Sequence, residues 1–255
     1  TQPPMPAIIT SLLDTDLYKF TMWQALLHRH PQTQAEYEFV CRNQPAYPLA
    51  DLLDEVNAEL DHLCQLRFTP GELDYLGGLR FIKSDFIDFL RIFQFQRAFI
   101  SASAEGEQLR IVARGPQVHV MGFEIFVLSI VNELYFRRFD AAAALAQGRI
   151  NLAQKIAQLQ QLASEVALAH PFELFDFGVR RRYSSAWQRE VVQAFASQAG
   201  EWFKATSNVY LARELNLVPV GTMAHEYLQT YQALGVRLRD FQTAALENWV
   251  QEYRG

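Results

Sequence analysis

Short apolar segments alternate with helical segments in the last third of this 255-residue chain, and this rhythm constrains the fold most. Residues 174–178 and 217–220 are strand-like, and a further apolar segment leads into Thr206. Residues 184–199 and 209–215 have helical spacing, and a helix resumes from Met223. Strands and helices that alternate at this spacing predict parallel βα units.

The first 140 residues have a mixed pattern. Residues 34–41 alternate apolar and charged side chains, which predicts a strand with one wet face. Thr69 and Glu72 flank Pro70 as a capping box, which predicts the start of a helix. The other expected elements are helices at 18–30, 49–66 and 124–136, and strands at 95–100, 109–113 and 118–120.

A long stretch between Asp140 and Pro171 contains no proline, and apolar residues recur in it at helical steps from Ile156 to Val166. This spacing predicts a scaffold helix with one buried face. We therefore predict an α/β fold, with a mixed sheet-and-helix domain at residues 1–140 and an α/β domain at residues 141–255.

Composition excludes several classes of protein. The chain has 23 Lys and Arg against 28 Asp and Glu, a net charge of −5, which argues against a dedicated nucleic-acid binder. Cys41 and Cys64 are the only cysteines, and they have neither disulfide-framework nor zinc-site spacing, so we expect a reduced, cytoplasmic protein with no cysteine-bound metal. No apolar run approaches the roughly 20 residues of a membrane span, and the N-terminus does not have the pattern of a signal peptide.

Three strand-to-helix junctions are candidate ligand sites, because ligands bind parallel α/β folds where strands end and helices begin. Arg180, Arg181 and Arg182 follow Gly178 closely and form either a phosphate or carboxylate clamp or a solvated charge run with a structural pair to Asp176 or Glu190. Thr206, Ser207 and Asn208 stand at the start of a helix and form either an anion or polar-ring site or an ordinary N-cap.

The third junction carries His225, the histidine of the six that is best placed for chemistry. Adjacent helical residues do not face each other, so Glu226 is not secure as its carboxylate partner. A structural role for His225 stays open at this point. The sequence has no GxxxxGK[ST], GxGxxG, HExxH or GxSxG motif, so the common nucleotide loops, zinc-protease sites and hydrolase elbows are not indicated.

Four motifs in order identify a family. They are Asp14-Thr-Asp-Leu-Tyr-Lys-Phe-Thr-Met22, Phe175-Asp-Phe-Gly-Val-Arg-Arg-Arg182, Ala205-Thr-Ser-Asn-Val-Tyr-Leu-Ala212 and Gly221-Thr-Met-Ala-His-Glu226. Together they resemble nicotinate phosphoribosyltransferase, in a bacterial or fungal form. The resemblance runs from about residue 11 to the end, and it implies that the second domain is the first part of an irregular, TIM-like α/β barrel.

The resemblance implies an ATP-dependent, ligase-type pentosyltransferase of NAD salvage. Such an enzyme joins nicotinate to phosphoribosyl diphosphate, with ATP as co-substrate and Mg²⁺ as cofactor, and acts as a cytoplasmic homodimer with its site at the subunit interface. His225 matches the histidine that ATP phosphorylates. Phe177 and Tyr18 match the rings that sandwich the pyridine, with Tyr18 supplied by the neighbouring subunit. Arg180 and Arg42 match arginines that bind phosphate, the latter across the dimer.

Ser207 is the residue expected to select acid over amide. The nicotinamide-using relatives resemble this stretch but carry an aspartate there, whereas a serine hydroxyl can donate to a nicotinate carboxylate. Thr206 is expected beside it in the substrate site. Family members run well beyond 255 residues, so the resemblance also implies that later barrel strands are absent from this chain. The alternatives are therefore a nicotinamide-specific enzyme or a fragment that cannot turn over.

Overall fold

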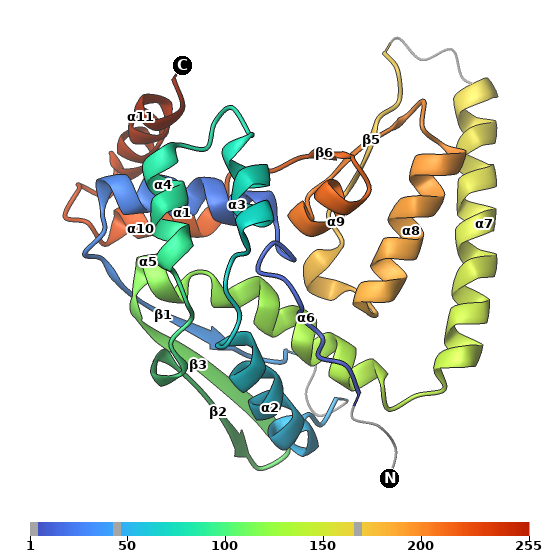
Figure 1. Ribbon diagram of the computed structural model, residues 1–255, viewed down its shortest axis with the longest axis horizontal. Coiled ribbons are helices and arrows are strands. Elements are labelled where there is room, and N and C mark those ends of the chain that lie inside the picture. Colours follow the sequence, from blue (N-terminus) through green and yellow to red (C-terminus); the bar gives the residue numbers. More distant parts are fainter. Residues whose placement is uncertain (1–4, 43–46, 166–169, 255) are drawn as a thin grey trace.

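The computed structural model describes residues 5–42, 47–165 and 170–254 as an α/β protein with two three-stranded sheets (Figure 1). The α/β class predicted from the sequence is confirmed. The elements of the N-terminal part are helices α1 (Leu17–Arg29), α2 (Leu53–Leu63), α3 (Pro70–Gly77), α4 (Ser84–Ile92), α5 (Gln117–Val120) and α6 (Phe123–Phe136), 3-10 turns η1 (Ala50–Leu52) and η2 (Arg97–Phe99), and strands β1 (Gln34–Phe39), β2 (Ile100–Glu105) and β3 (Gln108–Pro116).

The first sheet is antiparallel in the order β1-β3-β2. Tyr37 lies opposite Ala113 and Phe39 opposite Ile111, so the apolar set predicted for β1 shares one face with that of β3. Glu36 and Glu38 lie on the other face and are exposed. The alternation in the sequence therefore set both the strand and its buried side.

Two local predictions in this part have opposite outcomes. The capping box at α3 is confirmed, because the Thr69 hydroxyl accepts from the Glu72 N–H and the Glu72 carboxylate accepts from the Thr69 N–H. The strand predicted at residues 118–120 is wrong, since this segment forms α5 directly after Pro116. Two alternating valines fit one helical turn as well as a strand, so the pattern was too short to decide.

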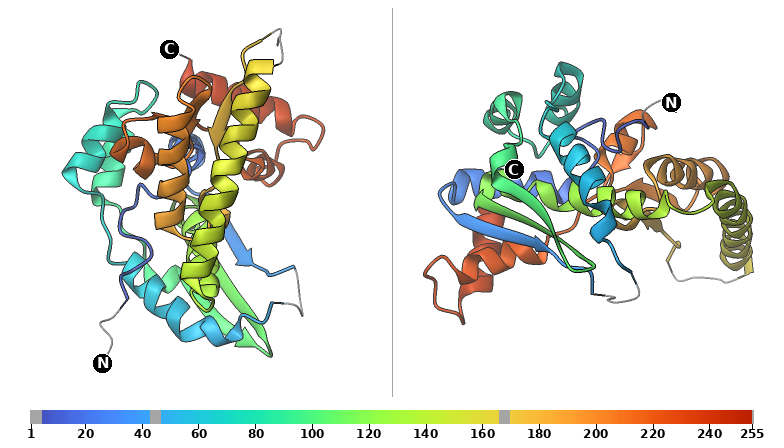
Figure 2. Two further views of the ribbon diagram at one scale, coloured as in Figure 1. Left: turned by 90° about the vertical axis from the view of Figure 1, so that its right-hand side faces the viewer. Right: turned by 90° about the horizontal axis from the view of Figure 1, so that it is seen from below.

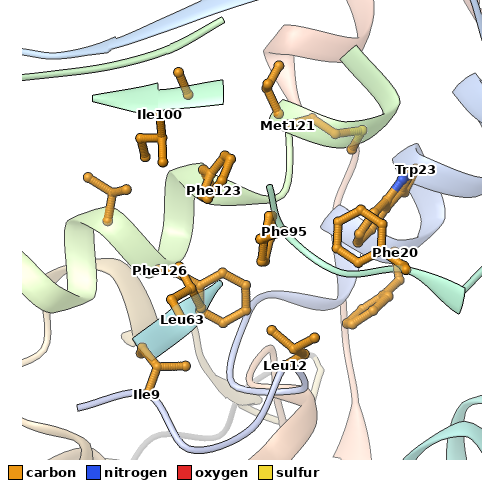
Figure 3. Packing of buried hydrophobic residues seen from close by; sticks show 14 of the residues in the cluster. Ile9, Leu12, Phe20, Trp23, Leu63, Phe95, Ile100, Met121, Phe123 and Phe126 are labelled. Carbon is orange, nitrogen blue, oxygen red and sulfur yellow. The ribbon is translucent and has the colours of Figure 1, made fainter. Parts of the chain in front are cut away.

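The main core contains side chains of α1, α2 and α6, among them Phe20, Leu63 and Phe126 (Figure 3). Trp23 packs against the rings of Phe20 and Phe93, with centroids 6.3 and 4.7 Å apart, and its indole N–H donates to the carbonyl of Val118 at 2.6 Å. Phe95 stacks on Phe123 at 4.3 Å. This aromatic cluster anchors α1 and α6, which both carry side chains of the candidate site.

Residues Gln117–Phe136 are long and apolar enough to pass for a membrane span, with a mean hydropathy of 1.4. Within the part of the chain that the structure describes, 67% of this segment is buried inside the protein. The burial is that of a core helix, and it explains the hydropathy without a bilayer.

Helix α7 (Ala141–Glu165) is the long helix predicted after Asp140, and it runs along the outside of the protein beside α8 (Ser185–Gln198) (Figures 1 and 2). The expected buried face is wrong over the described residues, because Ile156 alone is buried on this helix. Val166, the end of the predicted stripe, lies outside the described residues. The helix itself was predicted correctly, but little of its surface is buried against the rest of the protein.

The second sheet is parallel in the order β4-β5-β6, as the βα rhythm predicted. Its elements are β4 (Leu174–Asp176), η3 (Val179–Arg181), β5 (Phe203–Thr206), α9 (Val209–Glu214) and β6 (Val218–Pro219). The chain then returns to the N-terminal part, where α10 (His225–Gln232) and α11 (Phe241–Tyr253) lie beside α1 (Figure 1).

Tyr227 and Tyr231 of α10 belong to the main core, although they lie beyond the predicted boundary at residue 140. The hydroxyl of Tyr227 donates to the carbonyl of Ala245, which ties α10 to α11. The division into residues 1–140 and 141–255 stays a prediction. The return of α10 matters for function because it brings His225 back to the first sheet.

His119 gives this fold a dependence on pH. Its ring lies against Phe93, Phe95 and Phe99, and its Nε2 accepts from the Gln96 N–H. Burial lowers the pKa of His119 from 6.5 to about 4. The unfolded chain therefore binds more protons between these two values, and stability falls as the pH is lowered through that window.

We expect protonation of His119 to lower the free energy of unfolding by about 2 kcal/mol between pH 6.5 and pH 4. This is less than the full pKa shift implies, because the ring is partly exposed to solvent. Urea unfolding across this range measures the drop. His119→Gln should flatten the curve, whereas His170→Gln, at an exposed position, should not. Equal slopes in all three proteins would contradict the assignment.

Candidate active site

A cavity of about 760 Å³ lies between the inner face of the first sheet, α6 and the start of α10. Phe39, Ile111 and Val127 contribute to its apolar wall. Its polar lining comes from segments far apart in the chain, namely Tyr18, Arg42, Glu124, Arg180, His225 and Glu226. The cavity thus collects one or more residues from three of the four sequence motifs.

His225 is the first residue of α10 and is exposed on the cavity wall. Ala224 precedes it in an extended conformation, so the helix begins at the histidine. The imidazole shares the cavity with Arg180 and is not buried among aliphatic side chains. The imidazole is therefore open to a ligand in the cavity.

Glu226 does not pair with His225. Its Oε1 accepts from the ammonium of Lys19 at 2.5 Å, and Oε2 of Glu124 accepts from the same ammonium at 2.5 Å. Lys19 has 2% of its side chain exposed and lies behind the cavity wall, whereas Glu124 and Glu226, with 28% and 17% exposed, form part of that wall. The three residues form a triad that is closed to solvent on the lysine side. The doubt about a His225–Glu226 pair, raised from helix geometry alone, was justified.

The two carboxylates of the triad differ. Burial raises the pKa of Glu226, and the nearby Glu124 adds to the rise against the pull of Lys19. Burial also opposes ionisation of Glu124, but Lys19 and Arg180 outweigh it and lower its pKa. Glu124 therefore carries the negative charge more firmly than Glu226 does.

Tyr18 and Arg180 lie together in one chain. The guanidinium of Arg180 is 5.8 Å from the centre of the Tyr18 ring, and its Nε is 3.9 Å from Oδ2 of Asp16. Burial raises the pKa of Tyr18, so it stays a neutral phenol. Tyr18 and Arg180 therefore meet within one chain, because both line the same cavity. That a neighbouring subunit supplies the tyrosine stays a prediction.

The arginine triplet divides into three environments. Arg180 has 45% of its side chain exposed and lines the cavity, and Arg181 is exposed outside it. Arg182 is buried and forms two hydrogen bonds of 2.7 Å to the carboxylate of Asp14. A structural pair is found for Arg182, but the predicted partners Asp176 and Glu190 were wrong, because the partner is Asp14. The anion clamp at Arg180 stays a prediction.

Thr206 and Ser207 do not line the cavity, and both have 0% exposure. The Thr206 hydroxyl donates to Asp176 at 2.7 Å, and Asn208 caps α9 through the Leu211 N–H, so the N-cap interpretation is confirmed for this segment. The hydroxyl of Thr206 holds the end of β4, and its placement in the substrate site stays a prediction.

The Ser207 hydroxyl donates to Oδ1 of Asp16 at 2.5 Å. The hydroxyl is thus engaged by Asp16 and has 0% exposure in this structure. The direct contact expected between Ser207 and a ligand carboxylate stays a prediction. Ser207 lies behind Asp16, which in turn faces Arg180 at 3.9 Å. Any effect of Ser207 on a ligand acts through these two side chains.

Phe177 and Arg42 are both exposed, but they stand differently toward the cavity. Arg42 follows β1 and lines the cavity, whereas Phe177 is 46% exposed beyond the end of β4 and is not part of the lining. The structure therefore brings Tyr18, Arg42, Arg180 and His225 together and leaves Phe177 outside this group.

Sequence reasoning missed Lys19, Glu124 and Asp16. Each is a charged residue within an apolar segment, and an ionic group at such a position is buried and must find a partner. That signal was present, but it does not name the partner. Among the described residues no group of three or more His, Cys, Asp or Glu side chains is arranged to hold a metal ion.

Comparison with known proteins gives the family. Residues 13–132 match the model of the nicotinate phosphoribosyltransferase N-terminal domain, and residues 172–255 match that of the nicotinate phosphoribosyltransferase family. A nicotinate phosphoribosyltransferase of Herminiimonas arsenicoxydans is 63% identical over 251 residues, which are 98% of this chain, and one of Chromobacterium violaceum is 57% identical over 99% of it. The chain spans about 63% of the length of each relative.

Solved structures give the same answer. A nicotinate phosphoribosyltransferase of Vibrio cholerae superposes with a TM-score of 0.88 at 35% identity, over 98% of this chain and 59% of that one. The enzyme of Porphyromonas gingivalis superposes with a TM-score of 0.82 at 29% identity, over 97% and 61%. Two family models in sequence order, close relatives and matching structures agree: the chain belongs to the nicotinate phosphoribosyltransferase family.

Proposed function

We propose that the complete protein joins nicotinate to phosphoribosyl diphosphate, coupled to ATP hydrolysis through a phosphohistidine at residue 225. The observation that carries the proposal is the exposed His225 on a cavity wall shared with Arg180 and Tyr18. The free cysteines support a reducing, cytoplasmic location. Because this chain spans 63% of its relatives' length, the activity is assigned to the whole protein.

Recognition of nicotinate rests on shape and charge. The Tyr18 ring offers a face for a flat heterocycle, and Arg180 beside it can donate charge-assisted hydrogen bonds to the carboxylate. Phe177 is proposed as the second ring, since it stands three residues before Arg180 on the same loop. Arg42, which follows β1 and lines the same cavity, is proposed to meet phosphate oxygens.

Energy coupling needs a nucleophile in the cavity. An imidazole nitrogen of His225 attacks the γ-phosphorus of ATP, a nitrogen–phosphorus bond forms, and the bond to the departing ADP oxygen breaks. Arg42 and Arg180 offset the negative charge of the nucleotide. The phosphoramidate then adds negative charge at the mouth of the cavity until water removes it.

The transfer step forms a bond between the pyridine nitrogen and the anomeric carbon of the ribose while the bond from that carbon to diphosphate breaks. Its transition state has oxocarbenium character, so the protein chiefly positions the ring nitrogen and stabilises the leaving diphosphate. Mg²⁺ is proposed as cofactor, but the described residues form no magnesium site, since Glu124 and Glu226 are engaged by Lys19. No step is derived through the metal.

Labelling with γ-labelled ATP tests the proposal. The complete enzyme should take up acid-labile label at His225, and His225→Ala should abolish it. His170→Ala, at an exposed position outside the cavity, should leave the label unchanged. Label that persists in His225→Ala refutes the phosphohistidine.

Ser207→Asp tests the preference for acid over amide. A carboxylate at this buried position would meet Asp16, which now accepts from the serine, and the extra charge would compete for Arg180. We expect the affinity for nicotinate to fall about tenfold or more, relative to nicotinamide. Ser207→Asn, which matches the size without the charge, is the control. An equal loss in both variants would show that size, not charge, matters.

A homodimer with a shared active site is part of the proposal. Arg42 and Phe177 are exposed and are the two predicted site residues best placed to serve a neighbouring subunit. Turnover by this 255-residue chain beside a chain of family length separates the complete enzyme from a fragment without activity. Sedimentation velocity of both proteins gives the oligomeric state.

A further inference from the structure

The ammonium of Lys19 joins α1 to α6 and α10 behind the cavity wall, because it donates to Glu124 and to Glu226. Its side chain is 2% exposed, and its two carboxylate partners lie 105 and 207 residues further along the chain. Lys19 does not line the cavity, and the proposed reaction makes no use of it. A buried cation at this position therefore needs a separate explanation.

The surroundings of Lys19 are built to hold a charge. Removing an ammonium from water is costly unless it is paired and hydrogen-bonded. Glu124 and Glu226 each accept at 2.5 Å, and the rings of Tyr18 and Tyr37 lie 5.7 and 5.8 Å from the nitrogen. With one positive and two negative groups the triad has a net charge of −1, and loss of the lysine would make it −2 at a site largely removed from water.

The triad also fixes the direction of His225. Successive residues of a helix point about 100° apart. Glu226 is held by Lys19, and Tyr227 is held in the core with 0% exposure and a hydrogen bond to the Ala245 carbonyl. Because the side chains of Glu226 and Tyr227 are both held, the first turn of α10 cannot rotate. His225, which precedes them, therefore faces the cavity.

We propose that Lys19 is a positioning residue, which holds the first turn of α10 through Glu226 so that the His225 imidazole is presented to the cavity. The proposal deepens the proposed function and depends on it only where His225 is taken as the phosphoryl acceptor. The orientation itself can be measured without ATP.

Imidazole NMR signals of ¹⁵N-histidine-labelled protein provide that measurement, with His225→Ala assigning the relevant signals. In Lys19→Met the His225 signals should shift and broaden because the first turn samples several orientations. The signals of His170 serve as the internal reference, and Lys155→Met makes the same substitution at an exposed site on α7. Unchanged His225 signals in Lys19→Met would overturn the proposal.

Lys19→Met leaves two carboxylates buried without their cation and can unfold the protein, so a second variant is needed. Lys19→Met combined with Glu226→Gln restores the net charge of the triad while omitting the ionic tie to α10. We expect this double variant to melt near the wild-type temperature, with His225 still perturbed and its phosphorylation by ATP about 100-fold slower.

Wild-type NMR signals and labelling rate in the double variant would show that Lys19 only balances charge, which overturns the proposal. If the wild-type enzyme takes no label from ATP, the proposed phosphohistidine fails, and the NMR comparison still decides the role of Lys19. The two failures are therefore distinguishable.

Discussion

Arg182→Met is expected to lower the free energy of unfolding by about 3–5 kcal/mol, because it leaves a buried carboxylate without its cation. The guanidinium makes two hydrogen bonds of 2.7 Å to Asp14, and both side chains have less than 10% exposure. The pair joins the segment before α1 to the end of η3. Urea unfolding of this chain measures the loss.

Arg181→Met is the matched control, since the same residue type one position earlier is exposed. It should change the free energy of unfolding by no more than about 0.5 kcal/mol. Asp14→Leu combined with Arg182→Met should cost less than Arg182→Met alone, because no unpaired charge then remains. Similar losses in Arg181→Met and Arg182→Met would contradict this account of the triplet.

Arg180→Met is expected to weaken nicotinate binding by about 10- to 100-fold, the value of a hydrogen bond to a charged group. The folded structure should be retained, because nearly half of this side chain is exposed. Nicotinamide lacks the carboxylate, so its affinity should change much less. Isothermal titration of the complete enzyme with both ligands provides the measurement.

Arg181→Met again serves as the control and should bind nicotinate as the wild type does. If Arg180→Met also binds nicotinate normally, the carboxylate is recognised elsewhere, and Arg42, which lines the same cavity, becomes the first residue to test. If both ligands weaken equally, Arg180 acts on the ring or on the fold and not on the carboxylate.

Local signals in the sequence predicted local structure well. The capping box at Thr69, the alternation of β1 and the parallel order of β4, β5 and β6 depend on neighbouring residues or on chain rhythm, and all three are found. Prediction failed where the pattern was short, as at residues 118–120. It also failed where burial depends on distant surfaces, as for α7, whose helical period said nothing of what would cover it.

The candidate site divides in the same way. His225, Arg180, Arg42 and Tyr18 were all predicted, and the structure places them on one cavity. Lys19 and its two carboxylate partners were not predicted. A charged residue in an apolar helix indicates that a partner exists, but the sequence does not show which residue it is. Those partners are 105 and 207 residues away.

By itself the sequence determined the order of the motifs, the βα rhythm and, through them, the family. The tertiary structure alone decided that Arg180 faces the cavity while Arg182 is buried against Asp14, and that Ser207 lies behind Asp16. The physical reason is that propensities, caps and hydrophobic periods act within a few residues. The direction and charge partner of a side chain depend on segments that only the folded chain brings together.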